Sequence, residues 1–251
     1  MPRSWALPLC VEQYGVRFRI SRVENCDTDE LAGLFLPFLR ECGQDHGPMP
    51  EISFRPSAKS TDILAVLAPL YVAHGLFPIH AAGVELRSGV TLYVGASGSG
   101  KSTLARVALA SGHKIIGDDV VLVRKRDAGI EVLPWSCSIQ DETQAKRPSL
   151  LAPERFASGT LRAVFYPSIG TQPLSAFAPI TGPLALPLLS AQLLWASEPR
   201  SLLAQRDLIR ELLAIPSHDL VLGRDILDQP AAFFARCERI LDHEVAALAQ
   251  R

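Results

Sequence analysis

Residues 92–105 read LYVGASGSGKSTLA, and this stretch decides the fold. Residues 95–102 match the pattern G-x-x-x-x-G-K-[ST] without a mismatch. Residues 91–94 before the loop, TLYV, are typical of a strand. Residues 101–111 after it have the composition of a helix, which Gly112 ends. A strand, a glycine-rich loop and a helix in this order predict a P-loop, which binds the phosphates of a nucleoside triphosphate.

The residue types of the loop suit a polyphosphate. Glycines allow the backbone to wrap closely around phosphate oxygens, and the loop N–H groups and the helix N-terminus then face the anion. Lys101 supplies a point charge near the β- and γ-phosphates, and Ser102 supplies a hydroxyl to Mg²⁺. The expected cofactors are therefore ATP and Mg²⁺. The residues expected to hold the nucleotide are Gly95, Ala96, Ser97, Gly98, Ser99, Gly100, Lys101, Ser102 and Thr103.

A pair of acidic residues follows the P-loop. Asp118 and Asp119 come after two isoleucines and begin seventeen residues beyond Lys101, which leaves room for one helix, one turn and one strand. The spacing predicts that both emerge from the strand next to the P-loop strand, at its carboxyl end, where open α/β sheets bind ligands. Paired carboxylates there suit phosphoryl transfer, since one can hold Mg²⁺ and the other can accept the proton of an attacking hydroxyl.

His80 opens the segment HAAGV, on the strand that precedes the P-loop strand. A histidine on an apolar strand is by itself more often a core residue with one satisfied hydrogen bond than a functional group.

Three segments in register give His80 a second interpretation. IHAAGVEL, LYVGASGSGKSTLA and GHKIIGDDVVLV together resemble the catalytic core of the HPr kinase/phosphorylase family, in order and spacing over residues 80–123. The resemblance implies that Asp118 is the base that activates the acceptor hydroxyl, that Asp119 lies beside the metal, and that His80 lies close to Asp118 and tunes it. It also implies an α/β P-loop fold of the phosphoenolpyruvate carboxykinase type, like the C-terminal part of HPr kinase, with a mixed and strongly bent sheet.

The chain departs from that family after the aspartates. Residues 136–175 contain no Glu-x-x-Gly-rich segment of the type EIRGLG, so the HPr substrate, the phosphorylase activity and the hexamer do not follow. The layout is closer to divergent relatives in biosynthetic clusters, including those that phosphorylate the C-terminal serine of lasso-peptide precursors. A small N-terminal region precedes the P-loop domain in those relatives. We accordingly expect a small α+β region at residues 1–75 and a P-loop kinase domain at residues 76–251.

The length, composition and net charge of the chain limit which binding partners it requires. The chain has 251 residues, of which 48% are hydrophobic and 20% charged, enough for one α/β domain or for a compact domain with a small appended layer. A net charge of −1 requires neither nucleic acid nor an anionic membrane as partner.

The five cysteines form no CxxC pattern and are expected to be free thiols in a reducing cytoplasm, so we expect a cytoplasmic protein. The oligomeric state stays open.

The remaining periodicities are read as local elements. The N-terminal region is expected to hold strands at residues 15–20 and 51–55, a helix capped by Asp27 and Glu30 that Pro37 kinks or ends, and a helix at residues 60–75 disturbed at Pro69. Beyond the strand and helix around the P-loop, strands are expected at residues 77–86 and 114–116, and a hairpin is expected to join residues 120–125 to 130–135. Residues 136–175 are poorly periodic, and a loop followed by a short strand is expected at 179–196. The last expected elements are helices at 200–214 and 230–249.

Three functions compete. The first is an ATP-dependent kinase that acts on a serine or threonine hydroxyl of a peptide or small protein; the second is a small-molecule kinase; the third is a nucleotide-binding regulator that transfers no phosphate. The aspartate pair and His80 argue against the regulator, which needs no base. Weaker candidates for contacting substrate are Asp141, Glu142, Lys146, Arg147, Arg200, Arg206 and Arg210, all of which also fit a solvated surface.

Overall fold

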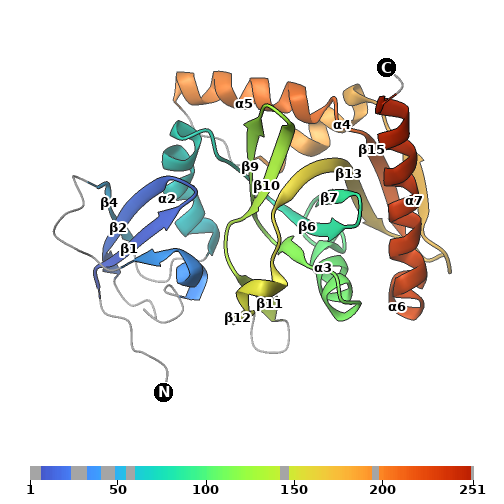
Figure 1. The fold of residues 1–251 in the computed structure, drawn as a ribbon, viewed down its shortest axis with the longest axis horizontal. Coiled ribbons are helices and arrows are strands. Elements are labelled where there is room, and N and C mark those ends of the chain that lie inside the picture. The colour runs from blue at the N-terminus through green and yellow to red at the C-terminus, as the bar shows by residue number, and fades with distance from the viewer. Residues whose placement is uncertain are drawn as a thin grey trace.

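The computed structural model describes residues 7–23, 33–40, 49–54, 60–141, 147–193 and 198–249 (Figure 1). These residues form a mixed α/β fold, in which a small N-terminal sheet lies beside a larger mixed sheet with helices on both of its faces. No helix in the described part of the chain is long and apolar enough to span a lipid bilayer.

The N-terminal sheet has four strands in the order β3-β1-β2-β4. The strands are β1 (Leu9–Gln13), β2 (Val16–Val23), β3 (Leu39–Arg40) and β4 (Glu51–Phe54). The strands predicted at 15–20 and 51–55 are thus confirmed as β2 and β4. Tyr14 and Gly15 join β1 to β2 with φ angles of 51° and 91°, the left-handed conformation that a two-residue hairpin turn requires.

Both predicted N-terminal helices have described counterparts. Of the first helix only its end is described: residues 33–35 are helical, and the 3-10 turn η1 (Leu36–Phe38), which contains Pro37, leads into β3. The expected cap at Asp27 and Glu30 lies outside the described residues. The second helix is α2 (Ser60–Ala73), which runs as one element through Pro69.

The core of the N-terminal sheet is shared with the rest of the chain. Phe18 and Phe35 pack edge-to-face, and Phe35 in turn packs against Trp135, which lies far along the sequence. Leu122 belongs to the same buried cluster. The division of the chain at residue 75 therefore stays a prediction. In β1, Cys10 is buried and disulfide-bonded, so the expectation of a free thiol is wrong there.

The larger sheet has nine strands, with the path β5-β9-β10-β13-β7-β6-β8, while β15 pairs with β13 and β14 with β15. β7, β13 and β15 are parallel neighbours, and the other pairs are antiparallel. The predicted hairpin is confirmed as β9 and β10. The strands are β5 (Phe77–Ile79), β6 (Ala81–Leu86), β7 (Gly89–Val94), β8 (Ile115–Gly117), β9 (Val121–Arg126), β10 (Gly129–Pro134), β13 (Gly159–Ile169), β14 (Ala176–Pro179) and β15 (Ser217–Leu222).

Strand β13 was missed by the sequence analysis, although its eleven residues form the centre of the sheet. It pairs with β10 near Gly159, with β7 over residues 161–165 and with β15 over residues 164–169. Residues 163–167 are all buried, because helices cover both faces. A strand buried on both faces loses the polar–apolar alternation by which strands are recognised, and Pro167 within it argued further against a strand.

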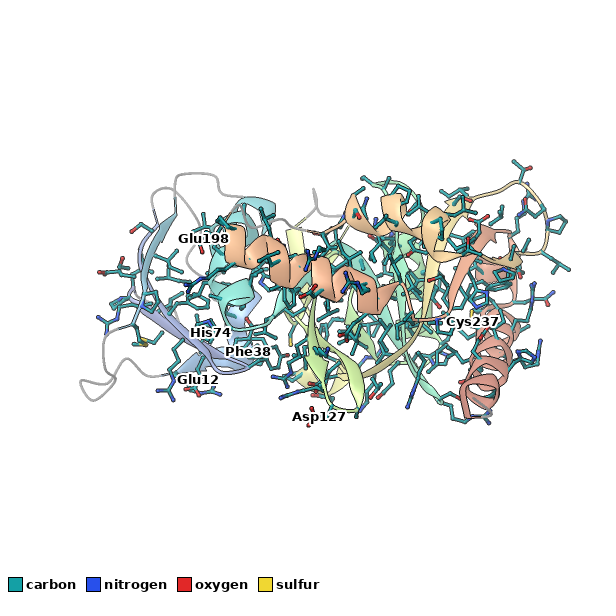
Figure 2. All side chains as sticks on the ribbon, turned by 90° about the horizontal axis from the view of Figure 1, so that it is seen from above. Glu12, Phe38, His74, Asp127, Glu198 and Cys237 are labelled. Carbon is teal, nitrogen blue, oxygen red and sulfur yellow. The ribbon has the colours of Figure 1, made fainter. Side chains whose placement is uncertain are left out.

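Helices cover the two faces of the sheet. In β7, Leu92 and Val94 belong to the core under α4 and α5, whereas Tyr93 belongs to the core under α3 and α7. Figure 2 looks down onto α5, which begins just after the labelled Glu198. The helices are α3 (Lys101–Ala110), α4 (Gly182–Ser190), α5 (Pro199–Leu212), α6 (Asp225–Asp228) and α7 (Pro230–Ala249); the hairpin of β11 (Ser138–Asp141) and β12 (Arg147–Leu150) and the 3-10 turn η2 (Pro153–Arg155) complete the described elements.

The predicted loop followed by a short strand at residues 179–196 is wrong, because α4 occupies half of that segment. Residues 194–196 lie outside the described residues. Pro183 lies in the first turn of α4, where its missing N–H removes no intrahelical bond. Pro187 lies inside the helix. Burial of Ala185 and Leu189, which are 0% and 1% exposed, against the sheet offsets the bond that Pro187 cannot make. The helices predicted at 200–214 and 230–249 are confirmed as α5 and α7.

Candidate functional site

The glycine-rich loop joins β7 to α3, as the motif predicts. Gly98 and Gly100 have φ angles of 82° and 101°, in the left-handed region that favours glycine. A Cβ on Gly100 would lie only 2.5 Å from Cδ1 of Leu222, at the end of β15, whereas a Cβ on Gly98 would meet open space. The carboxyl ends of the parallel strands β7 and β15 thus meet at the loop, the edge where such sheets bind ligands.

Lys101 folds back over the loop. Its Nζ donates hydrogen bonds to the carbonyl oxygens of Gly95, at 2.6 Å, and of Ala96, at 2.9 Å. The residue is 5% exposed, and burial lowers the pKa of its ammonium group, while the charge of Asp119 opposes this shift. The ammonium group is therefore held at the loop by carbonyl dipoles, with Asp119 as the carboxylate that acts on its pKa.

The two aspartates follow β8, but β8 is not the neighbour of the P-loop strand. The order is β7-β6-β8, and both pairs are antiparallel, so that β8 runs parallel to β7 with β6 between them. The prediction that the aspartates lie at the carboxyl edge of the P-loop strand is therefore confirmed, and the prediction that their strand is its direct neighbour is wrong. Asp118 is buried, at 4% exposed, whereas the side chain of Asp119 is 26% exposed.

Small residues bring this strand close to β6. A Cβ on Gly83 of β6 would lie 2.8 Å from Cβ of Ile116 in β8, and a Cβ on Gly117 would lie 2.6 Å from the carbonyl oxygen of Val120. Both glycines are thus required by close approach, the first between the strands and the second at the end of β8, just before Asp118 and Asp119.

His80 lies between β5 and β6 and contacts Asp119, the second residue of the aspartate pair. Its Nε2 is 3.1 Å from Oδ1 of Asp119, and its side chain is 31% exposed. The resemblance implied that His80 lies close to Asp118, which stays a prediction; the contact that the structure shows is between His80 and Asp119. Asp119 therefore lies beside His80, and its charge also acts on the pKa of the P-loop lysine.

Gln192 was missed by the sequence analysis. Nδ1 of His80 donates a hydrogen bond of 2.8 Å to Oε1 of Gln192, and the backbone N–H of His80 donates one of 2.8 Å to the carbonyl oxygen of the same residue. Gln192 lies two residues beyond α4, in the segment for which the sequence analysis expected a loop and strand. A single glutamine in an apolar stretch carries no signal in the sequence.

The residues present fit a magnesium nucleotide. No group of three or more His, Cys, Asp or Glu side chains able to hold a metal occurs within the described residues. Mg²⁺ in nucleotide sites needs no such cage, because one or two protein oxygens, phosphate oxygens and waters complete its shell. Ser102 and Asp119 are suitable oxygen donors. Oγ of Ser99 is buried in the loop and lacks a hydrogen-bond partner among the described residues, which leaves it available to a ligand.

The weaker candidates separate in the structure. On α5, Arg206 and Arg210 both lie near Asp207, at 3.1 and 3.9 Å, and their side chains are exposed, as is Arg200, which fits a solvated helix face. Asp141 and Arg147 are opposite each other in the backbone register of the β11–β12 hairpin. Glu142 and Lys146 lie outside the described residues.

The two left-handed glycines allow a test of the loop. Gly100→Ala should destabilise the protein more than Gly98→Ala. Either alanine must adopt a left-handed backbone, at a cost of about 1–2 kcal/mol. Only the alanine at position 100 must also displace the side chain of Leu222. Chemical denaturation of the two variants measures the difference. Equal losses of unfolding free energy would contradict the close approach of Gly100 to β15.

Comparisons with known proteins add little to this geometry. No protein-family model matches the sequence, and no curated protein is significantly similar to it. Among solved structures, the HPr(Ser) kinase/phosphatase from Coxiella burnetii is similar to this chain with a TM-score of 0.39 and 14% sequence identity, over 65% of this chain and 96% of that one. At this TM-score and identity the likeness establishes neither the family of the chain nor its activity.

Proposed function

We propose that this protein is an ATP-dependent phosphotransferase that transfers phosphate to a serine or threonine hydroxyl of a peptide or small protein. The observation that supports it most directly is that two groups of the site interact with Asp119. The charge of Asp119 acts on the pKa of the P-loop lysine, and Nε2 of His80 lies 3.1 Å from Oδ1 of Asp119. A P-loop alone binds phosphates, whereas a P-loop beside a histidine and two carboxylates also offers groups for moving a proton. The fold class that we propose with it is the phosphoenolpyruvate carboxykinase-like P-loop fold.

Each residue then has a role in binding or chemistry. The N–H groups of residues 95–103 and the N-terminus of α3 bind phosphate oxygens, and Lys101 leaves its loop carbonyls to neutralise charge on the β- and γ-phosphates. Bound ATP and Mg²⁺ supply the phosphoryl group and a second source of positive charge. Ser102 and Asp119 are the proposed oxygen donors to the metal.

Asp118 is the proposed base. As the acceptor oxygen bonds to the γ-phosphorus and the bond to the β-phosphate oxygen breaks, Asp118 takes the hydroxyl proton, and ADP leaves with the electron pair of the broken bond. Lys101 stabilises the charge that develops on the leaving phosphate. His80 orients Asp119, and through it the metal side of the site, in addition to the role beside Asp118 that the resemblance implies for it.

Two other functions stay in view. A small-molecule kinase would use the same residues, and a nucleotide-binding regulator would use the loop alone. The layout of a small N-terminal region before a P-loop domain favours a peptide acceptor, and we propose the tail serine of a lasso-peptide precursor as the first candidate. The HPr protein is the control acceptor in the same assay, because this chain lacks the EIRGLG-type segment that the HPr kinase family carries.

Mass spectrometry of peptide incubated with the protein, ATP and Mg²⁺ tests this proposal. We expect a gain of one phosphate on the precursor peptide, and none when its acceptor serine is replaced by alanine. Phosphorylation of a free small molecule but not of peptide would favour the small-molecule kinase. Binding of ATP without transfer to any hydroxyl would favour the regulator.

A pair of variants separates binding from chemistry. Ser102→Ala removes a proposed metal ligand and should weaken nucleotide binding in the presence of Mg²⁺ while changing it little in the presence of EDTA. Asp118→Asn should leave binding nearly intact under both conditions. Isothermal titration calorimetry with a non-hydrolysable ATP analogue measures both. Equal loss of affinity in the two variants would contradict this division of roles.

A further inference from the structure

Gln192 contacts His80 at two points, in the ring and in the backbone. Its side-chain oxygen accepts a hydrogen bond from Nδ1 and its carbonyl oxygen accepts one from the backbone N–H, both at 2.8 Å. The next residue, Leu193, forms an antiparallel bridge with Ile79. The segment after α4 therefore forms an antiparallel bridge with the end of β5, and Gln192 lies next to His80.

We infer that Gln192 is a positioning residue, which holds the imidazole of His80 so that Nε2 faces Asp119. The part of this inference that concerns reaction rate rests on the proposed function. With Nδ1 bound to Gln192 on one side and Nε2 at 3.1 Å from Asp119 on the other, the ring is fixed from both sides. An orienting third group of this kind is the usual partner of a histidine that acts on another side chain.

The imidazole could otherwise take other orientations. The torsion between Cβ and the ring is broad and roughly two-fold, so that a half-turn exchanges the side of the ring that carries nitrogen for the side that carries carbon. Within the described residues, Gln192 supplies the hydrogen bond to Nδ1, and without it that nitrogen no longer favours one orientation over the other. Asp119 would then face Nε2 for only part of the time.

Burial does not require this hydrogen bond. The side chain of His80 is 31% exposed and Gln192 is half-buried, so water could satisfy the polar atoms of both. A buried unpaired group would make the contact a condition of folding. Here the contact instead selects an orientation, and its removal should therefore change the site more than it changes stability.

The kinetic test uses three variants. Gln192→Leu removes the acceptor and should lower kcat by about 10- to 100-fold, the usual loss when an orienting partner is removed, with the KM for ATP unchanged. Gln192→Glu keeps an acceptor for Nδ1 and should retain more of the rate than Gln192→Leu. Gln229→Leu makes the same change at an exposed glutamine after α6 and should behave as wild type.

A double variant decides whether Gln192 acts through His80. If it does, Gln192→Leu should lower the rate of the His80→Ala variant no further, because the residue that it positions is already gone. A further loss in the His80→Ala background, or a wild-type rate in Gln192→Leu, would overturn the positioning role.

A second readout does not depend on turnover. In the ¹⁵N-labelled protein, the ring nitrogen signals of His80, assigned by their loss in His80→Ala, should shift in Gln192→Leu and stay unchanged in Gln229→Leu. Unchanged signals in Gln192→Leu would overturn the inference. A wild-type protein that transfers no phosphate would overturn the proposed function instead, and the His80 signals would still report whether Gln192 holds the ring.

Discussion

Asp118→Asn is expected to lower phosphoryl transfer by about 10²–10⁴-fold, the range that general-base help typically contributes. Asparagine keeps the shape of aspartate and most of its hydrogen bonds but cannot accept a proton as a carboxylate does. Single-turnover kinetics at saturating ATP and peptide measure the chemical step. Affinity for both substrates should change little.

The control for Asp118→Asn is Asp127→Asn, which makes the same change in the exposed turn between β9 and β10 (Figure 2). Because Asp118 is buried, thermal unfolding of both variants is measured alongside. A transfer rate in His80→Ala that falls below that of Asp118→Asn, with the fold intact, would contradict the assignment of Asp118 as base and would favour His80 as the proton acceptor.

Lys101→Ala is expected to lower transfer by about 10³-fold or more, since one preorganised donor to developing charge is worth about 10²–10³ and Lys101 carries a full charge. The fold should survive, because the hydrogen bonds that are lost lie within the loop, to the carbonyl oxygens of Gly95 and Ala96. Burial lowers the pKa of the ammonium group, so its removal also relieves a desolvation cost.

The same transfer assay with an ATP-binding measurement decides this prediction. Lys114→Ala, an exposed lysine just after α3, is the matched control and should behave as wild type. Transfer at the wild-type rate in Lys101→Ala would contradict the assignment of residues 95–102 as a working P-loop. Loss of cooperative unfolding would show that Lys101 is needed for the fold.

The sequence alone determined the parts of the site that are encoded locally. The loop from Gly95 to Ser102, its flanking strand and helix, and the end of α3 at Gly112 are each set by residues within a few positions of one another. Gly112 has a φ of 87°, and the N–H groups of Gly112 and His113 close the helix on the carbonyl oxygens of Leu109 and Ala108, as the C-terminal glycine predicts. Local backbone preferences suffice for such features.

The tertiary structure alone decided which groups meet at the site. It inserted β6 between β7 and β8, brought Gln192 to His80 across 112 positions of sequence, and paired His80 with Asp119. It also made β13, whose buried residues carry no alternation, the centre of the larger sheet. Strand order and side-chain partners depend on contacts between distant segments, whose energies come from packing and burial rather than from local preference. The phosphate loop can therefore be predicted from a single sequence, whereas the partners of the aspartates and the histidine are known only from the assembled sheet.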